Sequence, residues 1–362
     1  MRITSIQTLL VATQPTRPLR IALPGLTHNP ALLVRVNTSA GSVGFGEACP
    51  FEPVTGNNLQ QTRQFIQAMS TQLAGEDPLC IERIHRAMDA CDPGNAAAKA
   101  AIDIALYDIM GKHAKLPLYK LLGGNENSTK SDMTIGLDEP GCMSQKARQY
   151  VGEGFSILKI KVGLNPTDDL EAIRQIRAAV GPKVSLRLDA NQGWSVEQAI
   201  ATMRAMEAFA VDEIEQPVAN GDLVGLKAVR THIKQALMLD ESVCTPQDAA
   251  RALAAGAGDI INIKLMKCGG LYRALQINAV AEAAGVPCMV GCMSETRVSI
   301  AAGAALAVAL GNICYTDLDS HRAIAQIPGI KGGFEQHGET ITLLEKPGLG
   351  LDIDLDFDKE TV

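Results

Sequence analysis

The chain has 362 residues, of which 46% are hydrophobic and 20% charged, and its net charge is -7. This composition is typical of an ordered globular protein and excludes a mainly disordered chain. The negative net charge and the lack of Lys/Arg runs argue against nucleic-acid and membrane-surface partners. The length favours two domains, or one large barrel with a covering domain.

The first residues, the apolar runs and the cysteines together predict a cytoplasmic protein. The first residues alternate like an opening strand and lack the apolar run and cleavage site of a signal peptide. No stretch reaches the roughly 18 uncharged apolar residues that a membrane helix requires. The nine cysteines include no C-x-x-C pair, so we expect reduced thiols rather than disulfides or a zinc knuckle.

Residues 1–125 are predicted to form an α+β capping domain. Strand-like runs separated by turn residues come first, and helical segments follow: ITSIQTLLVAT, ALLVRVNT and SVGFGEA, then LQQTRQFIQAMSTQL and AAAKAAIDIALYDIMGKH. The GFGEAC run at 44–49 lacks the third glycine of a dinucleotide fingerprint. We therefore expect it to be a strand end near the cover of an active site.

Residues 126–325 are predicted to form a (β/α)8 barrel. Eight apolar runs alternate there with helix-like segments: DMTIG, ILKIK, VSLRLDAN, VDEIEQP, LMLDES, IINIK, PCMVGC and CYTDLD. From Lys161 to Asp317, their conspicuous polar residues recur at intervals of 24 to 28 residues. Strands separated by helical crossovers pair in parallel, and eight such units close into a barrel. Residues 326–362 are expected to form strands that return to the capping domain.

Three acidic residues, Asp189, Glu215 and Asp240, end consecutive predicted strands. In such a barrel they converge at the mouth, where unpaired carboxylates would repel one another. A divalent cation resolves that repulsion, and a ligand set of oxygens alone favours Mg²⁺, with Mn²⁺ as a substitute. The alternative is that each acid caps a helix or pairs with a lysine, but three in succession favour the metal.

Two pairs of polar residues, each with a lysine, flank these acids. The two-residue period of a strand places Lys159 with Lys161, and Asn262 with Lys264, on faces that point into the mouth. Lys161 precedes the acidic strands and Lys264 follows them, so the two amines are expected on opposite sides of the cation. Neighbouring positive charge is expected to lower their pKa values and make one a usable base. For either lysine alone, simple ion pairing with the acids is the alternative.

A dication between two opposed lysines suits removal of a proton α to a carboxylate. The cation stabilises the enediolate as its charge develops. One lysine takes the proton and the other returns one to the opposite face, which inverts the carbon.

Five short motifs carry a family resemblance: KIK at 159–161, DAN at 189–191, IEQP at 214–217, DES at 240–242 and NIK at 262–264. Together with GFGEA they resemble the muconate lactonizing enzyme subgroup of the enolase superfamily over nearly the whole chain. The resemblance implies that Asp189, Glu215 and Asp240 bind Mg²⁺ and that Lys161 and Lys264 form the acid/base pair. It also implies that Lys159 polarises the substrate carboxylate and lowers the pKa of Lys161.

The last predicted strand ends in YTDLDS, and a period of two places Asp317 and Asp319 on one face. A second acid pair in a carboxylate-binding site suits a substrate ammonium group, although a solvated turn is the alternative. The D-x-D pattern resembles that of dipeptide epimerases, which invert the C-terminal residue of L-Ala-Xaa dipeptides. An o-succinylbenzoate synthase, N-acylamino acid racemase or muconate cycloisomerase of the same subgroup is the other reading of the site, and a non-catalytic binding protein is less favoured.

Substrate selectivity is expected to come from loops at 23–30 and 49–56. By resemblance, members selective for glutamate carry a basic residue in the first loop, where this chain has Pro24. Phe51 favours an apolar C-terminal residue, whereas Glu52 leaves a cationic one open. Thr134 and Met293 are expected as further substrate contacts, and the protein is expected to be a homo-oligomer.

Overall fold

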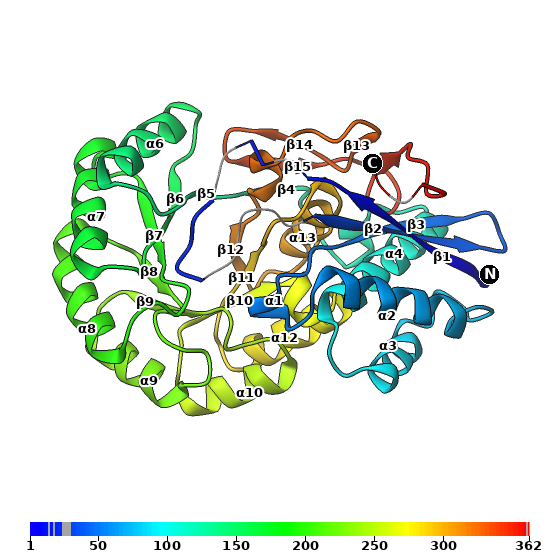
Figure 1. Cartoon of the computed structure of the whole chain (residues 1–362), viewed down its shortest axis with the longest axis horizontal. Coiled ribbons are helices and arrows are strands. Elements are labelled where there is room, and N and C mark those ends of the chain that lie inside the picture. The colour runs from blue at the N-terminus through cyan, green and yellow to red at the C-terminus, as the bar shows by residue number, and fades with distance from the viewer. Residues whose placement is uncertain (14, 17–18, 24–29, 360, 362) are drawn as a thin grey trace.

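The computed structural model describes residues 1–13, 15–16, 19–23, 30–359 and 361. Figure 1 shows two adjoining parts: a ring of helices around a parallel sheet, and a smaller part built from the beginning and the end of the chain. Both termini lie at the smaller part, on the right of the view. An active site at the barrel mouth therefore has cover from N-terminal residues.

The smaller part contains an antiparallel sheet in the order β1 (Ile3–Val11), β2 (Ala31–Thr38) and β3 (Val43–Ala48). Its helices are α1 (Glu52–Thr55), α2 (Leu59–Gln72), α3 (Ile81–Cys91), α4 (Ala96–Ala114) and α5 (Leu118–Leu121). Of the 19 residues of α4, 14 are buried, because this helix lies between β3 and the barrel. A Cβ on Gly46 would lie 1.9 Å from the carbonyl oxygen of Ala101, so glycine is required where β3 meets α4.

The predicted barrel is confirmed. Its strands pair in parallel in sequence order: β5 (Met133–Ile135), β6 (Ile157–Lys161), β7 (Ser185–Asp189), β8 (Glu213–Glu215), β9 (Ala236–Leu239), β10 (Ile260–Lys264), β11 (Cys288–Gly291) and β12 (Ile313–Asp317). Between the first and last strands, the Asp132 amide donates to the Thr316 carbonyl at 3.4 Å. The carboxyl ends of all eight strands therefore face one mouth.

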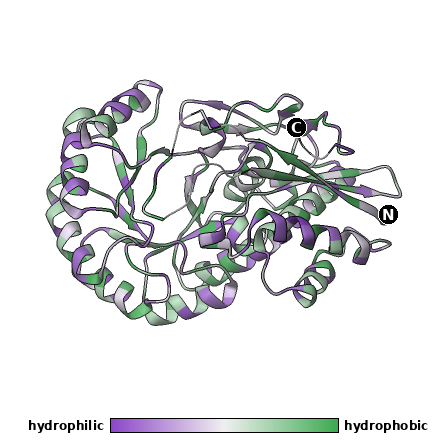
Figure 2. Ribbon diagram, in the orientation of Figure 1, coloured by the Kyte–Doolittle hydropathy of each residue, from purple (hydrophilic) through white to green (hydrophobic). Residues whose placement is uncertain are grey.

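Helices follow the strands on the outside of the sheet: α6 (Pro140–Gly152), α7 (Pro166–Val180), α8 (Val196–Ala205), α9 (Leu223–His232), α10 (Pro246–Ala255), α11 (Leu265–Cys268), α12 (Leu271–Ala283) and α13 (Arg297–Ala309), with 3-10 turns at Met206–Phe209 and Ser320–Ala323. The crossover helices in Figure 2 carry both hydrophilic and hydrophobic residues, as amphipathic helices do. Ser195 and Thr245 form capping boxes that start α8 and α10.

The last segment forms two small antiparallel sheets. One pairs β13 (Ile330–Gly332) with β16 (Leu351–Ile353), and the other joins β14 (Phe334–His337) and β15 (Thr340–Leu343) to β4 (Ser128–Lys130). The tail also contacts the capping part: the Leu349 amide donates to Asp108 at 2.9 Å, and the Phe357 and Phe45 ring centroids lie 6.0 Å apart. The domain limits at 125 and 325 stay predictions.

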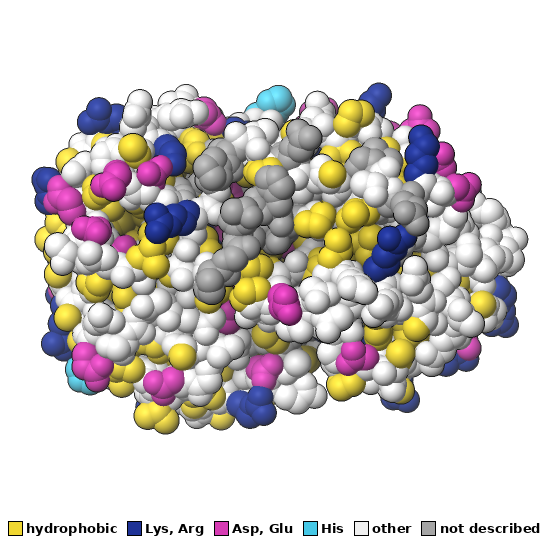
Figure 3. Space-filling view, viewed as in Figure 1, with side chains coloured by type: hydrophobic (Ala, Val, Ile, Leu, Met, Phe, Trp, Pro, Cys, Tyr) yellow, Lys and Arg dark blue, Asp and Glu magenta, His cyan; other side chains and the backbone are white. Residues whose placement is uncertain are grey.

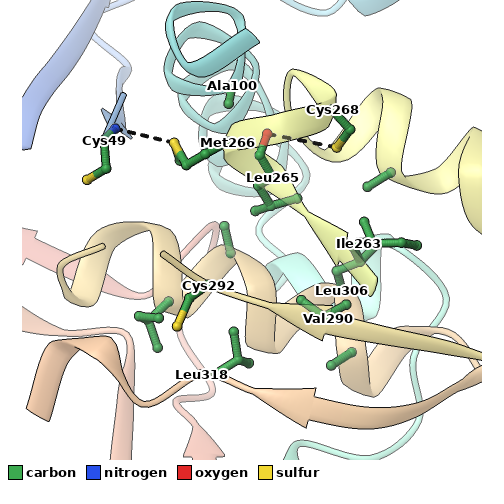
Figure 4. Packing of buried hydrophobic residues seen from close by; sticks show 14 of the residues in the cluster. Cys49, Ala100, Ile263, Leu265, Met266, Cys268, Val290, Cys292, Leu306 and Leu318 are labelled. Carbon is green, nitrogen blue, oxygen red and sulfur yellow. Dashed lines mark hydrogen bonds between the residues drawn. The ribbon is translucent and has the colours of Figure 1, made fainter. Parts of the chain in front are cut away.

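The capping part and the barrel share a buried interface. In Figure 4, Cys49 and Ala100 of the capping part face Met266 of the barrel, and the Cys49 amide donates to the Met266 sulfur at 3.3 Å. The buried Glu47 carboxylate accepts hydrogen bonds from the Thr296 amide at 2.8 Å and the Ser299 amide at 2.9 Å, at the start of α13. These contacts fix the cover over the barrel mouth.

None of the helices in the described part of the chain is long and apolar enough to cross a membrane. All nine cysteines are free.

Candidate active site

A cavity of about 360 Å³ lies at the carboxyl ends of the barrel strands. Barrel residues form its floor, and N-terminal residues between 13 and 23, together with 51 and 54, form its cover. Figure 3 shows acidic and basic side chains interspersed over the visible face, with hydrophobic ones near its centre. The expected position of the site, at the barrel mouth beneath the capping part, agrees with this cavity.

The three predicted metal ligands lie at the carboxyl ends of three neighbouring strands, although among the described residues their ligand atoms are not a group within 4.8 Å of one another. Asp189 ends β7, Glu215 ends β8, and Asp240 directly follows β9; all three are buried. Burial and the neighbouring carboxylates raise the pKa of Glu215 to about 8. Burial also raises the pKa of Asp189, but Lys161 and Lys159 outweigh it and bring the value to about 2. Three crowded carboxylates, one of which is difficult to ionise, are a donor set that a divalent cation would stabilise.

The two predicted acid/base lysines approach from opposite ends of this trio. Lys161 Nζ lies 2.6 Å from Asp189 Oδ2, and Lys264 Nζ lies 2.7 Å from Asp240 Oδ2. Burial lowers the pKa of Lys264, but Asp240 and other carboxylates outweigh it and raise that pKa. This direction is opposite to the lowering expected from the sequence, because the lysines themselves neutralise the acids here.

Lys159 connects the trio to the second acid pair. Its Nζ lies 2.7 Å from Glu215 Oε2, 2.7 Å from Asp317 Oδ2 and 3.2 Å from Asp189 Oδ2. Despite burial, these carboxylates raise the pKa of Lys159 well above its usual range. The contact with Asp317 was not predicted, since strand periodicity does not show which side chains meet across a barrel.

Asp317 and Asp319 are close together, but not for the reason expected. Strand β12 ends at Asp317, and Asp319 has a helical backbone at the start of a 3-10 turn. The period-of-two argument is therefore wrong for Asp319. The turn nevertheless brings both carboxylates and the Cys292 sulfur within 4.8 Å of one another. Asp319 Oδ2 also accepts a hydrogen bond from the Thr134 amide at 2.7 Å.

The remaining predicted substrate contacts, Thr134, Phe51 and Met293, line the cavity, whereas Glu52 is exposed. Pro24 lies outside the described residues. The cover is largely apolar, and its lining side chains include Leu19, Ile21, Leu23, Phe51, Val54 and Ile324.

Several polar residues of the site were not predicted. Glu241 and Asn191 line the cavity, and the pKa of Glu241 rises to about 7 through burial and the nearby Asp240 and Asp189 carboxylates. Buried Lys267 contacts Asp240. Asn191 and Glu241 belong to the DAN and DES motifs, and Lys267 lies three residues after Lys264, so the sequence did carry a signal for these positions.

Comparisons with known proteins agree with this geometry. The model described as "Enolase C-terminal domain-like" matches residues 142–357, and "Mandelate racemase / muconate lactonizing enzyme, N-terminal domain" matches 5–123. The chain is 43% identical over 333 residues to the hydrophobic dipeptide epimerase of Enterococcus faecalis, covering 91% of this chain and 94% of that protein. It is 39% identical over 355 residues to the L-Ala-D/L-Glu epimerase of Bacillus subtilis, covering 97% of both.

A crystal structure of the Enterococcus faecalis dipeptide epimerase with Mg and L-Leu-L-Tyr superimposes with a TM-score of 0.95 at 41% identity. The match covers 97% of this chain and all of that one. Both family models match consecutive parts of the chain, and full-length relatives match over nearly all of it. The chain therefore belongs to the mandelate racemase/muconate lactonizing enzyme family of the enolase superfamily.

Proposed function

We propose that this chain is a dipeptide epimerase that inverts the α-carbon of the C-terminal residue in L-Ala-Xaa dipeptides with an apolar Xaa. The observation that carries the proposal is the placement of Lys161 and Lys264, both of which line the cavity, at opposite ends of a buried carboxylate trio. The relatives above share the reaction and differ in the dipeptide that their names give.

Asp189, Glu215 and Asp240 would hold Mg²⁺, with Mn²⁺ as a substitute. When bound, the cation supplies Lewis-acid stabilisation of negative charge that develops on the substrate carboxylate. Asn262 Nδ2 donates to Glu215 Oε1 at 2.9 Å and so orients one of these ligands. Lys159, beside Glu215, would give the substrate carboxylate a further positive partner.

Lys161 and Lys264 carry the proton transfers. Each is buried and reaches the cavity from a different strand, β6 or β10, with the acidic strands between them. An α-carbon held above those strands has one amine on each face. One lysine removes the α-proton and the other, protonated, delivers a proton to the opposite face, which inverts the configuration.

Asp317 and Asp319 bind the α-ammonium group of the dipeptide. Both carboxylates are buried and line the cavity close to each other. Asp317 already contacts Lys159 at 2.7 Å, and Asp319 accepts a hydrogen bond from the Thr134 amide at 2.7 Å. A substrate ammonium would add a charge-assisted partner that both carboxylates share. A cycloisomerase, o-succinylbenzoate synthase or N-acylamino acid racemase substrate has no ammonium to offer them.

Apolar selectivity for the C-terminal residue follows from the cover. Leu23, Phe51 and Val54 present hydrocarbon to the cavity, and the exposed Glu52 does not line it in the described part of the chain. Burial of an apolar side chain there would contribute on the order of 1.5–3 kcal/mol, whereas a glutamate would lose hydration against this hydrocarbon. Lys146 also lines the cavity, but its Nζ already pairs with Asp138 at 2.8 Å. We therefore expect L-Ala-L-Leu and L-Ala-L-Phe to have higher kcat/KM than L-Ala-L-Glu.

Asp317→Asn separates this reaction from the alternatives. Measured by chiral chromatography with Mg²⁺ present, the variant should lose at least about tenfold in kcat/KM for L-Ala-L-Leu, because the ammonium loses a charged partner. The N-acetylated dipeptide should be a poor substrate for the unmodified protein. Faster turnover of the acylated compound than of the free dipeptide would favour an N-acylamino acid racemase instead.

A further inference from the structure

We propose that Lys267 is a positioning residue that restricts Asp240 to a single coordinating oxygen and thereby favours Mg²⁺ over Ca²⁺. This inference rests on the proposed role of Asp240 as a metal ligand. It concerns a buried lysine to which the proposed reaction gives no task.

The contacts of Lys267 tie together the segments around Asp240. Lys267 lies on α11, directly after β10, and is 4% exposed. Its Nζ contacts both Asp240 Oδ1 and the Asp240 carbonyl oxygen. It also donates to the carbonyls of Val243 at 3.3 Å and Asn262 at 3.2 Å. One ammonium group therefore joins the loop after β9 to strand β10 and to the side chain of Asp240.

Lys267 differs from the lysines that carry the chemistry. Lys161 and Lys264 line the cavity, whereas Lys267 is not among the described residues that do so. Lys264 Nζ contacts the carboxylates of Asp240 and Glu215, whereas Lys267 Nζ contacts three backbone carbonyls. Binding of a cation by the carboxylates would free Lys264 but would leave Lys267 held by those carbonyls.

The two oxygens of Asp240 have separate partners. Oδ1 forms an ion pair with Lys267, and Oδ2 lies 2.7 Å from Lys264 Nζ. With the Lys267 ammonium held against Oδ1, a cation that displaces Lys264 would be expected to bind Asp240 through Oδ2. Mg²⁺ demands a compact octahedral shell at about 2.0–2.1 Å, whereas Ca²⁺ accepts six to eight oxygens at about 2.3–2.6 Å and often chelates carboxylates through both oxygens. Blocking Oδ1 therefore penalises Ca²⁺ more than Mg²⁺.

The test is calorimetric titration of the full chain, without substrate, with Mg²⁺ and separately with Ca²⁺. The variant Lys267→Met removes the ammonium at similar volume. We expect its Mg²⁺ dissociation constant to rise at least about tenfold, as for other residues that orient metal ligands. We also expect the ratio of the Ca²⁺ to the Mg²⁺ constant to fall at least about tenfold. The matched control is Lys234→Met, whose side chain is 80% exposed, and its constants should equal those of the unmodified protein.

A purely structural role would lower thermal stability and leave the Ca²⁺/Mg²⁺ ratio unchanged, and that result would overturn the proposal. If Lys267→Met does not fold, a crystal structure of the unmodified protein with Mn²⁺ tests the proposal instead. We expect Asp240 to bind the cation through Oδ2 alone, with Lys267 on Oδ1. Binding of the cation by both oxygens of Asp240 would overturn the proposal. Mg²⁺ binding with no dipeptide turnover would contradict the proposed function and leave this inference standing.

Discussion

Lys161 and Lys264 lie on β6 and β10, with the three acidic strands between them. In the proposed reaction this separation would give each amine its own face of a bound α-carbon, so the two lysines would have roles that are equivalent in kind and opposite in stereochemistry. Each lysine is tied to one end of the carboxylate trio, so removal of one leaves the other with its own carboxylate partner.

Lys161→Ala and Lys264→Ala should each lower kcat/KM for epimerisation about 10³-fold or more, because one of the two proton transfers is lost. Each variant should still exchange the α-proton of one enantiomer with solvent, and the two variants should prefer opposite enantiomers. Proton NMR in D₂O with each dipeptide diastereomer measures this. Undiminished exchange of both diastereomers by both variants would refute the two-base assignment.

Much of the site could be predicted at the residue scale because strand ends in a barrel converge, whatever the details of packing. Asp189, Glu215 and Lys264 were predictable for that reason. The position of Asp319 was not, since it depends on a turn that replaces the strand after Asp317. The contact between Lys159 and Asp317 also could not be predicted, because it joins β6 to β12 across 158 positions of sequence.

At the scale of elements, the contact between β3 and α4 determines how closely the cover lies on the barrel. Gly44 and Gly46 let the strand approach the carbonyl oxygens of Ala105 and Ala101. The sequence predicted β3 and α4 separately, but their contact could not be read from periodicity. The eight predicted strands are confirmed. They could be predicted because each buried run of β-forming residues stands between helical segments of regular length.

Gly46→Ala should destabilise the protein by about 2–3 kcal/mol, because the added methyl group must displace the backbone of α4. Gly152→Ala is the control, since nothing lies within 4 Å of its added Cβ. Urea denaturation followed by circular dichroism measures both variants. Equal midpoints for the two variants would show that β3 and α4 do not meet as described.

At the scale of the whole molecule, the two ends of the chain meet on one side of the barrel, and Glu47 links the capping part to α13. The return of residues 326–362 to the capping part agrees with the expectation from the sequence. The Glu47 contact could not be predicted, because the sequence pattern shows elements but not which distant side chains pack together. Assembly into a homo-oligomer stays a prediction from the sequence.

Mg²⁺ should stabilise the folded chain as a whole, since its ligands come from three strands that are together only in the fold. At a hundredfold excess over its dissociation constant, the midpoint of thermal unfolding should rise by roughly 5 °C, and a chelator should reverse this. Differential scanning fluorimetry measures the shift. Asp189→Asn should reduce it strongly, and an equal shift in that variant would exclude Asp189 as a ligand.

The central claim is proton exchange at the C-terminal α-carbon of an apolar dipeptide. The most direct measurement is incubation of a dipeptide library in D₂O with Mg²⁺, followed by mass spectrometry. We predict uptake of one deuterium in L-Ala-Xaa dipeptides with apolar Xaa, located at the C-terminal α-carbon, with accumulation of the L,D-diastereomer. Absence of deuterium from every dipeptide, or undiminished uptake after exhaustive chelation, would contradict the account.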